Sequence, residues 1–144
     1  MPPLGKPQTL AVTFFTVSIP GVDTIGLFYE CSGLEMSFDV LEYREGGNND
    51  FVHRLPGRVQ YPNLVLSRGV TKDETLQTWF WATHTEAQRK EITVALSSSD
   101  ADARRTWTFA DAFPVRWTGP SLAADGTRIA TESLEIAHTG LKTA

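Results

Sequence analysis

The chain has 144 residues, the length of one ordinary domain, and residues 1–144 are predicted to form a single domain around one core. Hydrophobic residues make up 41% and charged residues 21%, values typical of soluble globular proteins, which argues against a disordered or fibrous chain. The formal net charge of -4 lacks the basic excess that favours binding to a nucleic-acid backbone or an anionic membrane, so we expect no sequence-specific nucleic acid binding.

The N-terminal sequence and the single cysteine narrow the cellular setting. No basic segment followed by an apolar run begins the chain, and no stretch approaches the length of a membrane span. We therefore expect synthesis in the cytoplasm without Sec-type export, and no membrane anchor. One cysteine, Cys31, permits neither an intrachain disulfide nor a four-thiolate zinc site.

Alternation of apolar and polar residues predicts that most of the chain is antiparallel β structure. In residues 34–40, Leu34, Met36, Phe38 and Val40 point one way and polar residues the other, which predicts a half-buried strand. In residues 113–118 the same pattern places Phe113, Val115 and Trp117 on one face. Further strands are predicted at residues 10–19, 26–31, 63–67, 92–98 and 133–137.

One segment departs from this alternation and predicts a helix over residues 72–84. Thr71 and Glu74 have the Ser/Thr-x-x-Glu spacing of a capping box. Helical spacing then connects Leu76, Trp79, Phe80 and Thr83. Trp79 and Trp81 would lie about 200° apart around the helix, so one of them is expected to be exposed or in an interface.

Between the early strands, residues 42–50 contain two glycines and two asparagines, which supply the positive-φ positions of a tight turn. Their flanks predict an extended hairpin arm over residues 39–58 that reaches outside the core or meets another chain. After the arm, Pro56 and Gly57 are expected to fix its return angle. The fold predicted from these patterns is mainly β: an antiparallel two-sheet β-barrel or sandwich with one helix and this arm.

A search for chemistry gives no catalytic residue and no metal or cofactor site. His53, His84 and His138 are isolated in sequence, and no nucleophile elbow or phosphate-binding loop occurs. Acidic residues around the glycines do not have the spacing of a calcium-binding loop. Cys31 is interpreted as a small apolar residue in or beside a strand.

Several blocks, in order along nearly the whole chain, resemble the tail tube family of contractile-tailed phages and extracellular contractile injection systems. They are residues 28–35 (FYECSGLE), 42–49 (EYREGGNN), 55–63 (LPGRVQYPN), 66–71 (LSRGVT), the helix with Leu76 and Trp79, 114–122 (PVRWTGPSL) and 132–141 (ESLEIAHTGL). Each block alone is weak, and the ordered set is specific.

The resemblance implies a fold similar to the tube subunit of type VI secretion and a structural, non-enzymatic role. Subunits would form hexameric rings that stack into a hollow tube inside a contractile sheath, with the sheath protein, baseplate or hub proteins, terminator proteins and lumen cargo as partners. The particle would be made in the bacterial cytoplasm and released by lysis. By the same analogy the arm would contact neighbouring subunits through Tyr43, Arg44, Glu45, Gly46, Gly47, Asn48, Asn49, Asp50, Leu55, Pro56, Gly57 and Arg58.

Two other functions are left open by the residues themselves. A monomeric β-barrel that binds carbohydrate or protein would present Trp81 or Trp107 on an aromatic-lined concave face. A hydrolase would use Cys31 with His53 or His138, although no orienting acid supports it.

Overall fold

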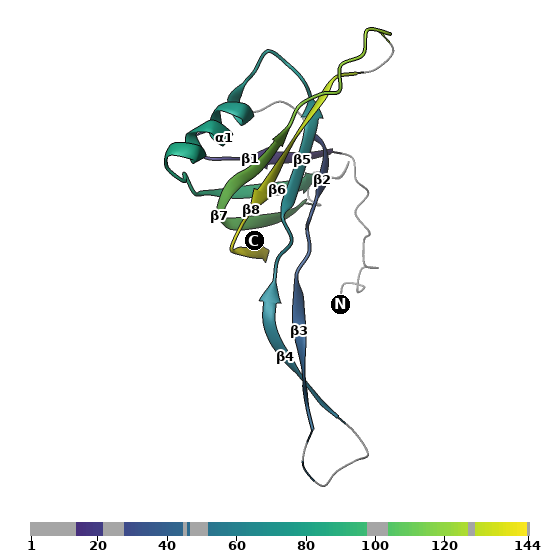
Figure 1. Ribbon diagram of the computed structural model, residues 1–144, viewed down its shortest axis with the longest axis vertical. Helices are drawn as coiled ribbons and strands as arrows, with labels where there is room; N and C mark the ends of the chain where they lie inside the picture. Colours follow the sequence, from purple (N-terminus) through teal and green to yellow (C-terminus); the bar gives the residue numbers. More distant parts are fainter. Residues whose placement is uncertain are drawn as a thin grey trace, which may run out of the picture.

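The computed structural model describes residues 14–21, 28–44, 46, 52–97, 104–126 and 129–143. These residues form one helix and antiparallel strands, which confirms the predicted fold class (Figure 1). The elements are β1 (Phe14–Ser18), β2 (Phe28–Ser32), β3 (Ser37–Tyr43), β4 (His53–Gln60), β5 (Leu64–Gly69), α1 (Thr75–Thr85), β6 (Lys90–Ser97), β7 (Arg104–Thr118), β8 (Thr131–Ala137) and β9 (Gly140–Thr143).

The long strand β7 belongs to both halves of the main sheet. Its first half pairs with β6 and β9, and its second half pairs with β8, so the strand order is β1-β6-β7-β8-β5-β2. Between the halves lie Asp111, with a positive φ of 50°, and a register shift between Pro114 and Arg116. In Figure 1 β6 and β5 accordingly run across one another. Among the described residues no ladder joins β1 to β2 to close a barrel.

The core lies between the two halves of this sheet and extends under α1. The strands predicted at residues 63–67 and 133–137 are β5 and β8, and alternation buries Leu64 and Leu66 on the first and Leu134 and Ile136 on the second. The core is completed by Val17, Ile19, Phe28, Leu76, Trp79, Ile92, Val94, Phe109 and Ala112. Because both sheet halves and the helix contribute, these elements form one continuous apolar cluster.

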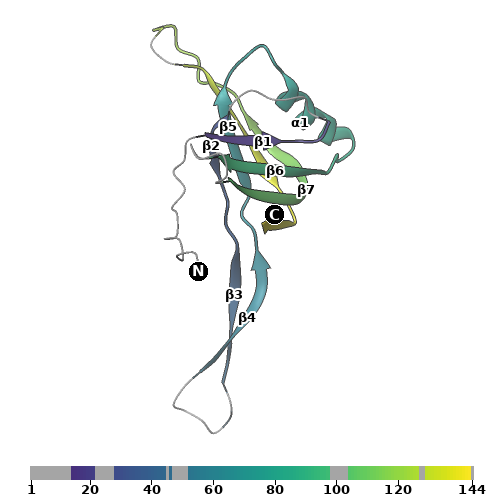
Figure 2. The same ribbon diagram turned by 180° about the vertical axis from the view of Figure 1, so that it is seen from behind.

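The prediction for residues 34–40 is wrong about burial. The strand there is β3, and all seven of its residues are exposed, including Phe38 and Val40, while Met36 just before it is 62% exposed. The reason is visible in Figures 1 and 2: β3 pairs only with β4, and this hairpin projects away from the main sheet. Alternation predicted a strand here, three residues earlier than the observed Ser37–Tyr43, but among the described residues no other element pairs with or packs on this hairpin.

The helix begins three residues later than predicted, at Thr75 instead of residue 72. Thr71 and Glu74 do not form the predicted capping box, since Glu74 makes no side-chain cap bond. Asp73 takes over this role: its carboxylate accepts hydrogen bonds from the backbone N–H of Thr75, at 3.0 Å, and from the Thr75 hydroxyl.

The two helix tryptophans point in different directions, as the sequence predicted. Trp79 is buried, and its indole N–H donates to the Gln88 carbonyl at 3.3 Å. Trp81 is 60% exposed and meets His84 edge to face. One face of α1 therefore packs against β7, and the other is open.

The alternation predicted for residues 113–118 is interrupted. Pro114 lies opposite Ile136 and Trp117 lies opposite Leu134, so Trp117 shares the face of Pro114 and not, as predicted, that of Phe113. The cause is the register shift between Pro114 and Arg116, since an extra residue in one strand moves the following side chains to the opposite face.

A buried polar network crosses the core, and sequence reasoning missed it. Arg68 on β5 is 1% exposed, and its Nε donates to the Glu132 carboxylate on β8 at 2.6 Å. Glu132 also accepts a hydrogen bond from the Trp117 indole at 3.1 Å. The remaining guanidinium nitrogens of Arg68 reach Asp73, one to its carbonyl at 3.2 Å and one to its carboxylate at 3.4 Å. The network thus connects three strands to the start of α1.

Candidate assembly surface

One face of the β3–β4 arm is apolar and exposed. Leu41 lies opposite Leu55, and Tyr43 lies opposite His53. Directly opposed residues of an antiparallel pair project to the same face, so these four side chains form one row. The Tyr43 and His53 ring centroids are 6.4 Å apart. Leu41 and Leu55 are 56% and 52% exposed even though they face each other.

The opposite face of the arm is apolar as well. Phe38 lies opposite Val59, and Val40 lies opposite Pro56. Phe38 is 64% exposed. Between these two pairs the register shifts by one residue, and here Asp39 accepts a hydrogen bond from the Gln60 amide at 2.8 Å.

An isolated two-stranded hairpin is marginally stable in water, and a row of exposed apolar side chains on both faces is unusual for a monomer. Among the residues that the structure describes, the arm is stabilised by its own ladder and cross-strand pairs and by no third strand. Its two faces are therefore suited to being covered by other molecules, one on each side.

The structure places the predicted contact residues as follows. Within the arm or at its described end lie Tyr43, Arg44, Gly46, Leu55, Pro56, Gly57 and Arg58. Outside the described residues lie Glu45, Gly47, Asn48, Asn49 and Asp50. The arm extends two residues further at each end than the predicted range of 39–58.

The prediction that Pro56 and Gly57 follow the arm is wrong. Both residues lie inside β4, at the register shift. A Cβ on Gly57 would lie 2.9 Å from the Asp39 carbonyl oxygen, so a larger residue would push the two strands apart. These residues therefore shape the ladder itself and not its return to the sheet.

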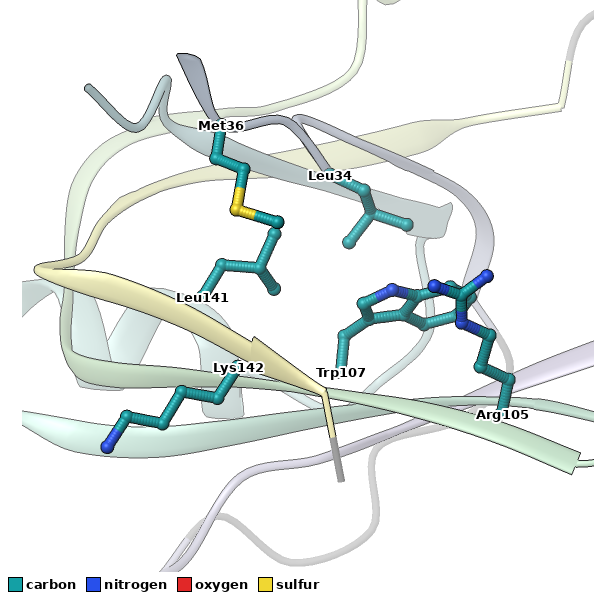
Figure 3. Close-up of a pocket in the computed structure, with 6 residues that line it drawn as sticks. All are labelled: Leu34, Met36, Arg105, Trp107, Leu141 and Lys142. Atoms are coloured by element: carbon teal, nitrogen blue, oxygen red, sulfur yellow. The ribbon is translucent and has the colours of Figure 1, made fainter. Parts of the chain in front are cut away.

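A pocket of about 550 Å³ opens at the base of the arm. Its lining comes from the segment before β3 and from β7 and β9: Leu34, Met36, Arg105, Trp107, Leu141 and Lys142. In Figure 3 Met36 and Leu141 point toward each other, and Leu34 points toward Trp107. The Arg105 guanidinium lies over the Trp107 ring, 5.1 Å from its centroid.

Cys31 lines an adjoining pocket of about 340 Å³ that shares Leu34 and Trp107 with the first. Burial raises the pKa of the Cys31 thiol to about 11. At neutral pH the thiol is therefore protonated, which is the opposite of what a nucleophilic cysteine requires.

This protonation predicts how Cys31 reacts with iodoacetamide. At pH 8 the native protein should contain about a hundredfold less thiolate than the unfolded chain, and should be alkylated correspondingly more slowly. The rate should still be rising with pH above pH 9, as followed by mass spectrometry. A plateau near pH 9 in the native protein would contradict the assigned environment.

His138 is held by aromatic neighbours and lies in no catalytic pair that the structure describes. Its ring is 4.8 Å from the Phe109 ring and 5.5 Å from the Tyr61 ring, centroid to centroid. Both ring nitrogens are buried; the backbone of Pro62 and Gly140 lies close to them without reaching hydrogen-bond geometry. Burial of the ring lowers the pKa of His138 below its ordinary value of 6.5.

A lowered histidine pKa has a definite consequence for stability. The unfolded chain takes up a proton at His138 near pH 6.5, before the folded chain does, so acid favours unfolding. The free energy of unfolding should fall as the pH drops from about 7 toward the lowered pKa, and should fall less in His138→Phe. Urea titrations at pH 7.5 and 5.5 measure the free energy of unfolding of both proteins. An equal fall in the wild type and in His138→Phe would contradict the prediction.

Neither a metal centre nor a membrane-spanning helix is found in the part of the chain that the structure describes. No cluster of three or more histidine, cysteine or acidic side chains is placed to hold a metal ion there. Nor does any helix of that part have the length and apolar character to cross a membrane.

Comparison with known proteins identifies the family of this chain. Residues 12–142 match the family model of the T4-like virus tail tube protein gp19. The chain belongs to this tail tube family. It is the tail tube protein of a phage tail or contractile injection system, and not an enzyme, which confirms the family resemblance of the sequence blocks.

Solved structures similar to this tail tube protein include chains of two larger assemblies. A chain of the extracellular contractile injection system PVC, in its sheath/tube terminator structure, is 30% identical, with a TM-score of 0.79, covering 97% of this chain and 99% of that one. A chain in the PVC sheath-tube complex is 29% identical, with a TM-score of 0.78 and coverage of 94% and 91%. A chain in the anti-feeding prophage baseplate is 26% identical, with a TM-score of 0.79 and coverage of 95% and 97%.

More distant structures share only the fold. Hcp1 from Flavobacterium johnsoniae is 14% identical, with a TM-score of 0.57 and coverage of 91% and 94%. This likeness confirms the predicted similarity of fold to the tube subunit of type VI secretion. A search of curated protein sequences finds no match for the tail tube protein.

Proposed function

We propose that this tail tube protein, with residues 1–144 acting as one tail-tube domain, assembles into hexameric rings that stack into a hollow tube. Contraction of a surrounding sheath would drive the tube through a target envelope and open a path for cargo or genome. The observation that carries the proposal is the arm, whose two faces are both apolar and exposed. A monomer gains nothing from this arrangement, whereas an arm held between two neighbouring copies would bury both faces.

Ring and tube follow from one kind of contact. An arm that projects from one copy and is received by the next is heterologous, because the two copies contribute different surfaces. Such contacts close into a ring when the rotation allows, and repetition along the axis stays open and gives a filament. In this proposal the residues of the arm that meet neighbours include Tyr43, Leu55 and Arg58, and residues 45–50 are proposed as a further contact.

The proposed partners follow from the assemblies in which the similar chains occur. Those chains come from structures described as a baseplate, a sheath-tube complex and a sheath/tube terminator, and one of them is described as 6-fold symmetrised. For this protein we accordingly propose contacts with itself, a sheath protein, baseplate or hub proteins and a terminator, with cargo in the lumen. Synthesis in the bacterial cytoplasm and release by lysis complete the proposal.

The test is negative-stain electron microscopy of the purified protein together with its mass by light scattering over a concentration series. Hexameric rings or hollow tubes are expected, formed by the protein alone or after addition of its baseplate proteins. A species that stays monomeric at high concentration with baseplate present would overturn the proposal. In that case the monomeric binding module would replace it.

A further inference from the structure

The pocket at the base of the arm has the size and the lining of a small-molecule site. Its volume of about 550 Å³ lies within the range of about 300–1,000 Å³ that is typical of ligand pockets. Its apolar lining residues are Leu34, Met36, Trp107 and Leu141. In Figure 3 these side chains converge from the segment before β3 and from β7 and β9. An occupant would therefore exchange water for apolar contacts on several sides.

The chain leaves this apolar lining partly open to water. Met36 is 62% exposed, and Leu34, Trp107 and Leu141 are only half-buried. Leu34 and Met36 lead directly into β3, whereas Trp107 and Leu141 belong to the main sheet. An occupant would thus fill the space between the main sheet and the base of the arm.

A positive charge lies directly beside the apolar floor. The Arg105 guanidinium is held over the Trp107 ring by a cation–π contact, 5.1 Å from the ring centroid. In the part of the chain that the structure describes, Arg105 forms no ion pair with a carboxylate. A guanidinium can hold an oxyanion through two parallel N–H bonds, so this end of the pocket is suited to an anionic group.

The other charges near the pocket point to Arg105 as the partner of that group. Lys142 also lines the pocket, but in Figure 3 its side chain points away from Trp107. Its ammonium therefore adds attraction at longer range. The adjoining 340 Å³ pocket is lined by Glu30 and, among the described residues, by neither of these cations. An anion is accordingly favoured in the first pocket and disfavoured in the second.

We propose that the pocket at the base of the arm binds an organic anion with an apolar body. Its carboxylate, sulfonate or phosphate group pairs with Arg105, and its body lies on Trp107 and Met36. Binding is non-covalent and needs one chain only. The site is therefore a further property of the subunit, independent of ring and tube formation.

The first experiment tests the charge of the ligand by calorimetric titration of the full chain with octanoate and with octanol. Octanol has the same apolar chain without the charge, and an apolar surface alone would favour it, because a carboxylate loses more on leaving water. Octanoate should nevertheless bind about threefold or more tightly than octanol, because its carboxylate pairs with Arg105.

Two matched variants assign this preference to one cation. Arg105→Gln should reverse the order of the two ligands, whereas Lys142→Gln should change it little, since the Lys142 side chain points away from Trp107. Both positions are exposed, so neither substitution should affect folding. Octanol binding as tightly as octanoate to the unmodified chain would overturn the anion site.

The second experiment locates the ligand with 8-bromooctanoate, whose bromine quenches the fluorescence of a tryptophan that it contacts. Quenching should be lost in Trp107→Phe and retained in Trp81→Phe, since Trp81 lies on the open face of α1. Met36→Ser should weaken octanoate binding by about threefold or more, because it removes part of the apolar floor. Tyr29→Ser is the matched control: Tyr29 is 58% exposed, close to the value for Met36, but lines only the adjoining pocket.

The outcomes separate this inference from the proposed function. Failure of octanoate to bind, or binding that Arg105→Gln and Trp107→Phe leave unchanged, would overturn the site. Weakening by Tyr29→Ser and not by Met36→Ser would place the ligand in the adjoining pocket and would also overturn it. Tube formation is measured without ligand by electron microscopy, so its presence or absence tests only the proposed function.

A second copy of the chain is the other occupant that the test distinguishes. Met36→Cys in a Cys31→Ala background carries a single thiol at the pocket. Maleimide labelling of this thiol in free subunits but not in tubes, together with no binding of octanoate to either, would make a neighbouring copy the occupant and overturn the ligand site. Octanoate that slows the labelling of free subunits would support it.

Discussion

Replacing Leu41 and Leu55 together by serine is expected to abolish tube formation while leaving the subunit folded. The two side chains face each other on one side of the arm and are both more than half exposed. If a neighbour covers them, their loss removes about 3 kcal/mol of apolar burial per copy, which weakens each association about a hundredfold. Because many contacts hold a tube together, this effect is repeated at every subunit.

Electron microscopy and sedimentation measure the assembly, and urea unfolding measures the subunit. The free energy of unfolding should change by less than about 1 kcal/mol, since both positions are on the surface of the isolated chain. Leu122→Ser is the matched control, because Leu122 is 85% exposed and lies outside the arm. Equal loss of tubes in the control, or unfolding of the double variant, would contradict the claim that a neighbouring copy covers Leu41 and Leu55.

The second large effect is expected in the buried network. Glu132→Ala should destabilise the subunit by about 3–5 kcal/mol, because it leaves the buried guanidinium of Arg68 without its closest partner. It also removes the acceptor of the Trp117 indole N–H. Since the whole free energy of unfolding of a domain is typically about 5–15 kcal/mol, a loss of this size would reduce the yield of folded protein.

Two further variants test this account by urea denaturation. Replacing Arg68 by methionine and Glu132 by leucine together should restore most of the lost stability, because no buried charge then remains unpaired. The control is Arg116→Ala, which breaks the 3.6 Å pair with Glu135 at the surface, where the Arg116 side chain is 74% exposed. It should cost less than about 1 kcal/mol. A cost for Glu132→Ala no larger than that of the control would contradict the network.

Local sequence patterns predicted strands reliably but could not say what covers them. The alternation in β5 and β8 identified the strands, and their apolar faces are buried because another part of the same chain lies against them. Equally regular alternation at residues 34–40 led to the wrong burial, since Phe38 and Val40 belong to the arm. The period of a pattern depends on the backbone alone, whereas burial depends on partners far away in sequence or in another chain.

The buried Arg68 was missed although the sequence contained its signal. Leu64, Leu66 and Arg68 are at alternate positions of one strand, so the pattern that buries the leucines also directs Arg68 to the core. On β8 the same holds for Glu132 relative to Leu134, and Glu132 lies directly opposite Arg68. Two opposite charges at core-facing positions of separate strands indicate a buried pair, but their register is known only from the fold.

Smaller errors have local causes. Thr71 and Glu74 matched the capping-box spacing, but Asp73 lies closer to the true start of the helix than Thr71 does, and its carboxylate is held by Arg68. Trp117 was placed on the wrong face because the extra residue at the register shift moves the later side chains of β7 to the opposite face. Residues adjacent in sequence do not determine which of two candidate side chains caps the helix. They do not determine where a strand contains a bulge either.

The arm has outer edges as well as faces. β3 and β4 pair only with each other, so each has one edge whose backbone N–H and C=O groups meet no strand among the described residues. Open edges beside apolar side chains are templates for amyloid-like strand pairing, and free subunits face this hazard at high concentration. The charges of Asp39, Glu42, Arg54 and Arg58, spaced along both strands, are the kind of gatekeeper residue that keeps such edges apart. The same hairpin must thus resist aggregation before it can serve in ordered assembly.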